Sequence, residues 1–382
     1  MDGYGNHTSK GKDDFPRKIL SQLHGSNGPV HAVTYSSSPG TYILTGSADR
    51  SIRLYNPIPS TTTSSSNSSS FIHKPSPSTP SSPTSLPPPG RLIQTFSAHG
   101  YEVLSLAVST DNATFASSGG DRAVFLWDVT SGTTIRRFSN SGHTTGRINA
   151  VIFAGVDDSL LVSGGHDTTV RIWDVRSQSS SKPVQTLGEA KDGVTSLVFD
   201  KEGTGAEVVA GSVDGRVRTY DVRMGRLVTD VMPGAVTSLC LARDGRTVLV
   251  GCLDSKLRLM DRSNGQCLRT YGGDKEGWTN NEIRVQSVLG GKERWVVAGD
   301  ENGSTEQNGE GRVWAWDLLT GKLVAKIAVP WGPGGGKVVV GRDGKEKERK
   351  NVVSCVAWKD GGFGNQFCVG GTSGVVTVFG DA

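Results

Sequence analysis

The chain has 382 residues, of which 41 are basic and 37 acidic, so its charge is nearly balanced. This composition supplies no clustered positive face of the kind that nucleic-acid binding requires, and direct sequence-specific nucleic-acid binding is not expected. No run of the sequence approaches the ~18 apolar residues of a membrane span, so we expect no membrane association. The 51 glycines and the short apolar segments favour one large all-β domain with many tight turns.

Residues 1–14 are polar and charged, and we predict a disordered N-terminal tail followed by one domain over residues 15–382. The tail has no apolar core of the kind found in a signal peptide. Five cysteines form no CxxC pair, and four of them lie in apolar, strand-like runs. Both features indicate reduced thiols in an intracellular protein, and we expect a cytoplasmic and nuclear location.

The first apolar stretch of the domain is RKILSQL, at Arg17–Leu23, and we predict that it forms a strand. After it, an eight-residue segment ending in Trp-Asp or a related pair occurs seven times, with successive copies starting 40 to 72 residues apart. The shortest interval matches the ~40–45 residues of a four-stranded WD40 blade. The seven copies are DRSIRLYN (49–56), DRAVFLWD (121–128), DTTVRIWD (167–174), DGRVRTYD (214–221), DSKLRLMD (254–261), EGRVWAWD (310–317) and SGVVTVFG (373–380).

Each full unit contains four short segments rich in β-branched and apolar residues, separated by turn residues. None carries the 3.6-residue periodicity of a helix. The sequence therefore predicts an all-β fold, a seven-bladed WD40 β-propeller. The last copy ends at the end of the sequence without an outer strand, and Arg17–Leu23 can supply it and close the ring.

Three units carry polar residues that could form a hydrogen-bonded chain from the loop before the unit to its third strand. The combination of His, Ser and Asp resembles a hydrolase triad. Because an enzyme needs one such site and this set recurs, we interpret it as a structural network. The sets are His99, Ser117, Asp121 and Trp127; His143, Ser163, Asp167 and Trp173; and a weaker set of His24, Thr45, Asp49 and Tyr55.

Residues 57–90 form a Ser/Thr/Pro-rich insertion between the third and fourth strands of the first unit. It has too few apolar side chains to offset chain entropy, so we predict disorder. Ser76, Thr79 and Ser82 each precede a proline, which makes them candidate phosphorylation sites for proline-directed kinases; composition alone would also produce such pairs.

A Gly/Lys-rich loop is predicted at residues 331–350, and a shorter one at 299–311. The longer loop begins WGPGGGKV, which resembles a phosphate-binding loop. It departs from that pattern because Trp331 stands at the first glycine and Val338 at the Ser/Thr that would hold magnesium. The seven histidines form no HxH or HxxxH pair. We predict no catalytic residue, no cofactor and no metal site.

Six stretches of the sequence resemble one family of WD40 proteins. They are FPRKIL (15–20), AHGYEVL (98–104), GGDRAVFLWDV (119–129), PVQTLGEAKDGVTSL (183–197), AGSVDGRVRTYDVRMG (210–225) and LDSKLRLMDRSNG (253–265). The family they resemble is that of the mitogen-activated protein kinase organizers, and the resemblance covers most of residues 15–265 and thins after Gly272. It implies a non-catalytic adaptor, monomeric within larger complexes, whose partners are splicing factors, MAP-kinase pathway components or both.

Two alternatives stay open. WDVR (173–176) and YDVR (220–223) resemble the Asp-x-Arg motif with which some WD40 substrate receptors dock on cullin-type ubiquitin ligases, although Arg176 and Arg223 are also ordinary strand-end residues. A propeller enzyme would need a convergent set of carboxylates, a base or a metal near the channel, and the sequence displays no such cluster.

Partner binding is predicted on the face where the loops from fourth to first strand and from second to third strand emerge. Aromatic and arginine side chains are favoured at interfaces, although Tyr101 and Trp278 could instead cap blade cores. The opposite face, which carries the Ser/Pro insertion, is the competing surface. The candidate residues are Tyr101, Arg147, His166, Asp192, Trp278 and Trp331.

Overall fold

The computed structural model describes residues 15–58, 87–139, 146–177, 182–201, 206–273, 276–303, 309–333, 335–336, 338–340, 346–362 and 364–381. The predicted tail (1–14), the phosphorylation candidates Ser76, Thr79 and Ser82, and His143 lie outside these residues. Most of the predicted insertion (57–90) lies outside them too.

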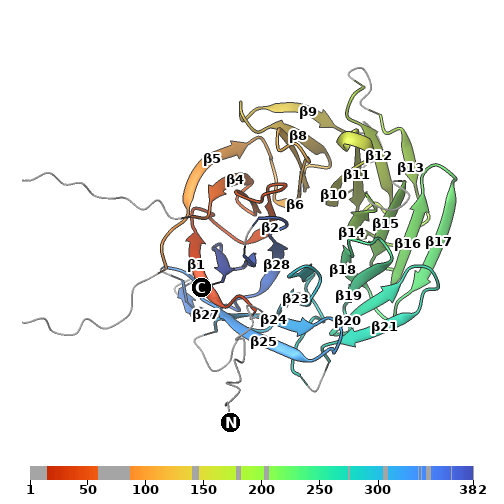
Figure 1. Cartoon of the computed structure of the whole chain (residues 1–382). Coiled ribbons are helices and arrows are strands. Elements are labelled where there is room, and N and C mark those ends of the chain that lie inside the picture. Colours follow the sequence, from red (N-terminus) through yellow and green to blue (C-terminus); the bar gives the residue numbers. More distant parts are fainter. Residues whose placement is uncertain are drawn as a thin grey trace, which may run out of the picture.

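Seven four-stranded antiparallel sheets surround a central axis, which confirms the predicted seven-bladed propeller (Figure 1). In each blade the strands follow one another from the inside of the ring outwards. The first three blades consist of β2 (Val30–Tyr35), β3 (Ile43–Ser47), β4 (Ser51–Asn56) and β5 (Arg91–Ser97); β6 (Val103–Val108), β7 (Thr114–Gly119), β8 (Val124–Asp128) and β9 (Thr134–Phe138); and β10 (Ile148–Ala154), β11 (Leu160–Gly165), β12 (Val170–Asp174) and β13 (Gln185–Leu187).

The next three blades repeat this arrangement. They consist of β14 (Val194–Phe199), β15 (Glu207–Ser212), β16 (Arg216–Asp221) and β17 (Arg226–Val231); β18 (Val236–Leu241), β19 (Thr247–Cys252), β20 (Lys256–Asp261) and β21 (Cys267–Tyr271); and β22 (Ser287–Gly290), β23 (Trp295–Gly299), β24 (Gly311–Asp317) and β25 (Leu323–Val329). A single 3₁₀ turn, η1 (Val156–Asp158), is the helical structure among the described residues, and it is far too short to cross a membrane.

The seventh blade combines the two ends of the chain. β28 (Val353–Trp358), β29 (Gln366–Gly371) and β30 (Val376–Gly380) are completed by β1 (Lys18–Leu23), which pairs antiparallel with β30. The pairing runs from Lys18 opposite Gly380 to Leu23 opposite Val376. The N-terminal strand therefore closes the ring, as the missing outer strand of the last repeat predicts.

A short hairpin lies in the region predicted as a Gly/Lys-rich loop. β26 (Val338–Val340) pairs antiparallel with β27 (Glu346–Glu348) between the sixth and seventh blades. The segment VVV is β-branched throughout, which favours extended backbone. The loop thus contains two strands of its own that belong to no blade.

The hydrophobic core is divided into clusters that lie between neighbouring blades. One such cluster joins Leu44 and Ile52 of the first blade to Val103, Phe115 and Trp127 of the second. Each blade buries both faces of its sheet in this way, so its stability depends on its neighbours. This division is typical of repeat architectures, in which one unit cannot bury its apolar surface alone.

In three blades a glycine on the second strand lies directly against a valine at the start of the next blade's inner strand. A Cβ atom built on Gly46 would lie 2.7 Å from Cγ1 of Val103, one on Gly164 2.5 Å from Val194, and one on Gly211 2.6 Å from Val236. Real Cβ atoms essentially never approach so closely. The missing side chain therefore sets how near two blades can pack.

Deleting residues 1–23 removes β1 and exposes the edge of β30, and the truncated protein should melt far below the full chain or fail to fold. Thermal denaturation followed by circular dichroism checks this. Deleting residues 1–14 alone, which removes no described residue, is the matched control and should leave the melting temperature unchanged. Equal melting temperatures for the full chain and the 1–23 deletion would contradict closure by β1.

Gly211→Ala should lower the free energy of unfolding by about 2 kcal/mol, because the added methyl group collides with Val236 in a packed core. Gly188→Ala is the control, since no atom lies within 4 Å of a Cβ at that position. Chemical denaturation of both variants measures the difference. A loss at Gly188 as large as that at Gly211 would show that loss of glycine flexibility, and not contact between blades, is responsible.

Candidate protein-binding face

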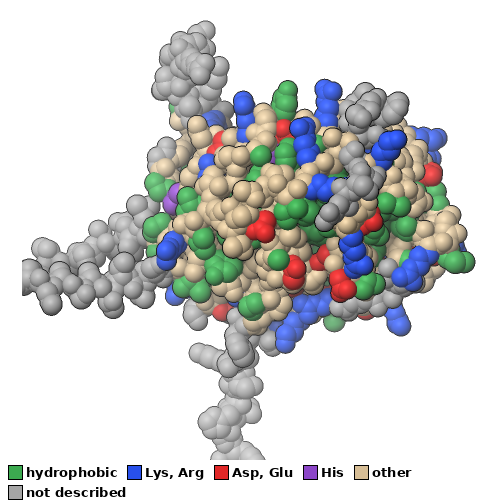
Figure 2. All heavy atoms as spheres, turned by 90° about the horizontal axis from the view of Figure 1, so that it is seen from above, with side chains coloured by type: hydrophobic (Ala, Val, Ile, Leu, Met, Phe, Trp, Pro, Cys, Tyr) green, Lys and Arg blue, Asp and Glu red, His purple; other side chains and the backbone are tan. Residues whose placement is uncertain are grey.

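The ring has two faces, which we call upper and lower. The upper face carries the loops from the fourth strand of one blade to the first strand of the next and from second to third strands; the lower face carries the other loops. In the side view of Figure 2, Lys and Arg side chains are interspersed with Asp and Glu. The surface in this view therefore presents a mixed charge pattern.

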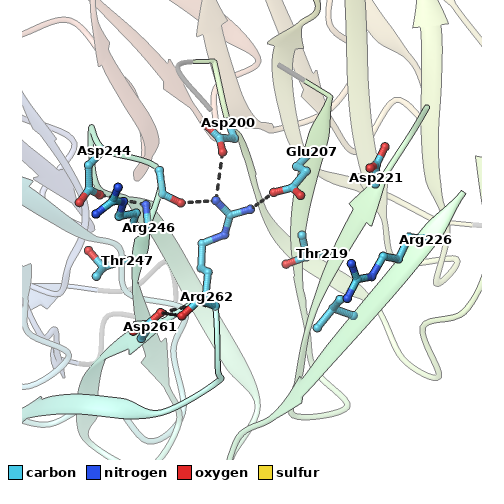
Figure 3. A pocket seen from close by; sticks show the side chains of 13 residues that line it. Asp200, Glu207, Thr219, Asp221, Arg226, Asp244, Arg246, Thr247, Asp261 and Arg262 are labelled. Carbon is cyan, nitrogen blue, oxygen red and sulfur yellow. Dashed lines mark hydrogen bonds and ion pairs between the residues drawn. The ribbon is translucent and has the colours of Figure 1, made fainter. Parts of the chain in front are cut away.

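A groove of about 1030 Å³ lies on the lower face between the fourth and fifth blades (Figure 3). Arg262 occupies its centre, donating to Asp200 at 3.1 Å, to Glu207 and to the backbone carbonyl of Gly245. The guanidinium comes from the fifth blade, and both carboxylates come from the fourth. Arg262 therefore joins two blades, and its charge is satisfied within the protein.

The polar set predicted for the second blade is brought together in the structure. His99 Nδ1 lies 2.5 Å from Oδ2 of Asp121, and its Nε2 lies 2.7 Å from Oγ of Ser117. The indole N–H of Trp127 donates to the same Ser117 oxygen at 2.8 Å. Burial lowers the pKa of His99 although Asp121 opposes the shift, which favours the neutral ring.

This arrangement differs from a hydrolase triad in its access to solvent. Ser117 is fully buried, and its oxygen is engaged by both His99 and Trp127. Asp121 also accepts the backbone N–H of Gly100 at 2.7 Å, which fixes the loop before the blade. The geometry therefore ties a loop to two strands and leaves no room for a substrate at the serine.

The third blade keeps only part of the pattern. Trp173 donates to Ser163 at 2.9 Å, as in the second blade. Asp167, however, forms an ion pair with Arg171 at 2.7 Å. His143 lies outside the described residues, so its predicted place in this set is untested.

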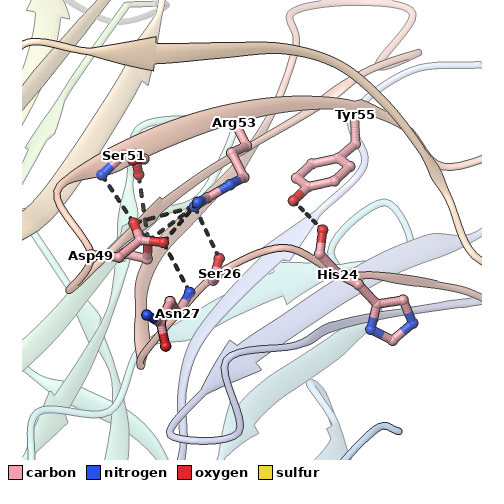
Figure 4. A network of polar contacts seen from close by, with 8 residues as sticks. His24, Ser26, Asn27, Asp49, Ser51, Arg53 and Tyr55 are labelled. Carbon is pink, nitrogen blue, oxygen red and sulfur yellow. Dashed lines mark hydrogen bonds and ion pairs between the residues drawn. The ribbon is translucent and has the colours of Figure 1, made fainter.

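The prediction that His24, Thr45, Asp49 and Tyr55 form a hydrogen-bonded chain in the first blade is wrong (Figure 4). Tyr55 donates its hydroxyl to the backbone carbonyl of His24 at 2.7 Å, so the imidazole of His24 is not used. Asp49 pairs with Arg53 at 2.7 Å and also accepts the backbone N–H groups of Asn27 and Ser51. An aspartate–arginine pair therefore replaces the expected chain through histidine.

The same pair recurs in four blades and was missed in the sequence analysis. In each repeat the aspartate is followed four residues later by an arginine on the third strand, a spacing visible in DRSIR, DTTVR, DGRVR and DSKLR. All the pairs belong to the upper face, where they join the turn before the third strand to that strand. They are Asp49–Arg53, Asp167–Arg171, Asp214–Arg218 and Asp254–Arg258.

Four of the six predicted binding residues are exposed on the upper face: Tyr101, Arg147, His166 and Asp192. Tyr101 stands out because 62% of this aromatic side chain is accessible, so it does not cap a blade core. These positions come from three neighbouring blades, the second, third and fourth. Whether a partner binds them stays a prediction.

The two predicted tryptophans occupy a different environment, because both are buried. Trp278 donates its indole N–H to the carbonyl of Gly299 at 2.7 Å and packs edge-on against Trp316. Trp331 is also buried, with the guanidinium of Arg349 over its ring. The prediction that these two indoles offer contact surface to a partner is therefore wrong. Trp278 instead caps a blade core, which was the alternative interpretation of this residue.

Arg176 and Arg223 are both exposed at the ends of third strands on the lower face. Among the described residues, no group of three or more His, Cys, Asp or Glu side chains could hold a metal ion. All five cysteines are free, and burial raises the pKa of Cys355 to about 12, which disfavours its thiolate.

Seven closed four-stranded blades with this recurring third strand define a WD40-repeat β-propeller. Residues 17–56 match the family "WD domain, G-beta repeat", and residues 102–285 match "Nucleolar protein 10-like, N-terminal domain". The chain is 37% identical to WD repeat domain-containing protein 83 of Rattus norvegicus over 83% of its length and 84% of the relative's.

The human protein of the same name is 38% identical over 84% of this chain and 85% of its own length. The Dictyostelium discoideum homologue is 31% identical over 81% and 87%. The chain therefore belongs to the family of WD repeat domain-containing protein 83.

The Asp214–Arg218 pair should make stability depend on pH. Burial alone would raise the pKa of Asp214, but hydrogen bonds from Arg218, Ser212 and the backbone of Lys191 outweigh it and lower the pKa to about 2. Because the pKa is lower in the folded state, the contribution of about 2 kcal/mol is present above pH ~4 and is lost as the pH falls toward 2.

Denaturation of the wild type and of Asp214→Asn between pH 2 and pH 7 measures this effect. The stability difference should be largest at pH 7 and shrink below pH 4. Asp157→Asn is the control, since its side chain is 85% exposed. A difference independent of pH would contradict a stabilising charge on Asp214.

Proposed function

We propose that this chain is a non-catalytic scaffold that binds other proteins through its upper face. The observation that carries the proposal is the exposed set of Tyr101, Arg147, His166 and Asp192 on a rigid closed ring. Recognition residues on loops held by a rigid framework are a common arrangement for binding. The sealed His99–Ser117–Asp121 set supports a structural and not a catalytic use of that triad-like group.

The finer part of the proposal is the identity of the partners. The resemblance to the mitogen-activated protein kinase organizers supports an adaptor in MAP-kinase signalling, in pre-mRNA splicing or in both, with a cytoplasmic and nuclear location. In this proposal the chain acts as a single copy inside larger complexes.

Affinity purification from cells followed by mass spectrometry tests both the proposed binding face and the identity of the partners. Tyr101→Ala combined with Arg147→Glu should reduce the recovered partners at least tenfold, because aromatic and arginine side chains dominate interface energies. Met224→Ala with Arg226→Glu is the matched control on the lower face, where Met224 is 80% exposed. Circular dichroism must show that both variants fold.

The set of recovered proteins distinguishes a splicing role from a signalling role and tests the choice of face. Recovery of splicing factors or of kinase-pathway proteins that depends on Tyr101 and Arg147 supports the corresponding role. An unchanged partner set with the upper-face variant, and a reduced one with the lower-face variant, would contradict the choice of face.

A ubiquitin-ligase substrate receptor is the second candidate, favoured only by the exposure of Arg176 and Arg223 on one face. It predicts that a cullin adaptor co-purifies with the chain and is lost in Arg176→Ala.

A further inference from the structure

The central channel opens on the upper face through a cavity of about 440 Å³. Its lining includes residues at the starts of the inner strands β2, β6, β10 and β28 and in the segment before β22. Figure 1 shows the ring of blades that these inner strands line. Four of the lining side chains can carry charge: His31, Glu102, Arg147 and Arg284. The other described residues that line the cavity are neutral, so these four determine its electrostatic character.

Arg284 reaches across the channel wall from the segment before β22. Its Nε donates to the carbonyl of Thr237 at 3.2 Å, and its Nη1 donates to the carbonyl of Asn149 at 3.0 Å. These acceptors belong to the fifth and third blades, so the guanidinium is held in a fixed position. Two of its five N–H groups are used in this way, and Nη2 has no acceptor among the described residues.

Arg284 differs from the other buried or partly buried arginines that form ion pairs in this protein. Arg53, Arg171, Arg218, Arg258 and Arg262 each face a carboxylate within 3.1 Å. Among the described residues, Arg284 forms no ion pair. Its neighbour is instead a second guanidinium, that of Arg147, and burial together with this like charge lowers the pKa of Arg284 to about 10.

The charges at the channel mouth do not cancel. Burial lowers the pKa of His31, with Arg147 and Arg284 acting in the same direction and Glu102 against it, which favours the neutral imidazole. Two guanidiniums and one carboxylate then leave one unbalanced positive charge. The guanidinium of Arg284, which is only partly exposed, is stabilised by an anion that supplies hydrogen-bond acceptors.

We propose that the mouth of the central channel binds an oxyanion presented by a partner protein, with Arg284 and Arg147 as its ligands. A single aspartate or glutamate carboxylate matches the one excess charge, whereas a phosphate dianion would leave the site negative. This inference rests on the proposed function, since it assigns a recognition chemistry to the upper face. Arg147 belongs to both the exposed set and the channel, which places the anion beside the proposed partner surface.

The test uses the full chain labelled with ¹⁵N and follows the arginine Nε–Hε resonances by NMR. The probes are acetyl-Gly-Glu-Gly-amide, the neutral acetyl-Gly-Gln-Gly-amide and inorganic phosphate. The Glu peptide should shift the resonance of Arg284 in a saturable manner, and the Gln peptide should not. Because no partner protein is used, the result is independent of whether the proposed scaffold role is correct.

Three variants complete the experiment. Arg147→Gln should weaken binding of the Glu peptide roughly fivefold, and Glu102→Gln should strengthen it roughly threefold, because each removes one charge near the site. Arg284→Met should abolish binding; if it fails to fold, Arg147→Gln and Glu102→Gln still decide the question. Arg226→Gln, on the lower face, should have no effect.

Loss with Arg147→Gln and gain with Glu102→Gln support the site. Tighter binding of phosphate than of the Glu peptide would overturn the carboxylate as its occupant. Absence of a saturable shift with either anion, or equal effects of Arg147→Gln and Arg226→Gln, would overturn the site itself.

Discussion

The close approach of one blade to the next is the contact on which the rest of this structure depends. Gly46, Gly164 and Gly211 each leave space for a valine at the start of the following inner strand. The contact between this valine and the glycine fixes the position of the inner strand. The position of the strand in turn determines where the side chains of the channel wall lie. Asn149, for example, follows β10's first residue and donates to the carbonyl of Val194, which itself packs over Gly164.

Buried polar groups give each blade its connection between loops and strands, and two chemistries serve this purpose. The second blade uses a neutral histidine between an aspartate and a serine, while four other blades use an aspartate–arginine pair. Both satisfy the turn aspartate, which would otherwise be a partly buried, unpaired charge. The channel mouth is the contrasting case, because there the guanidinium of Arg284 has carbonyl partners but no carboxylate.

The repeated third strand predicted the blade number and the closing role of Arg17–Leu23, because a strand with period-2 apolar residues must occupy equivalent positions in each blade. Four polar residues of the second blade could also be predicted, since His99 and Asp121 flank strands of recognisable spacing. The aspartate–arginine pairs were missed because the analysis followed histidine, although the Asp-x-x-x-Arg spacing was present. The sequence could not decide between burial and exposure for Trp278, and it did not indicate the burial of Trp331, because both lie in long connections where no periodicity distinguishes a capping side chain from an exposed one.

Closure by β1 also has a consequence for the order of events during synthesis. Lys18–Leu23 is made before any other described strand, and its partner β30 is the last of the described strands to be made. At ~5–20 residues per second, β1 waits roughly 20–70 s for that partner. Throughout this interval the growing chain is an open arc whose first inner strand, β2, has no seventh blade to pack against. Nascent-chain protection is therefore needed most for β1 and β2, the described strands that wait longest for the seventh blade.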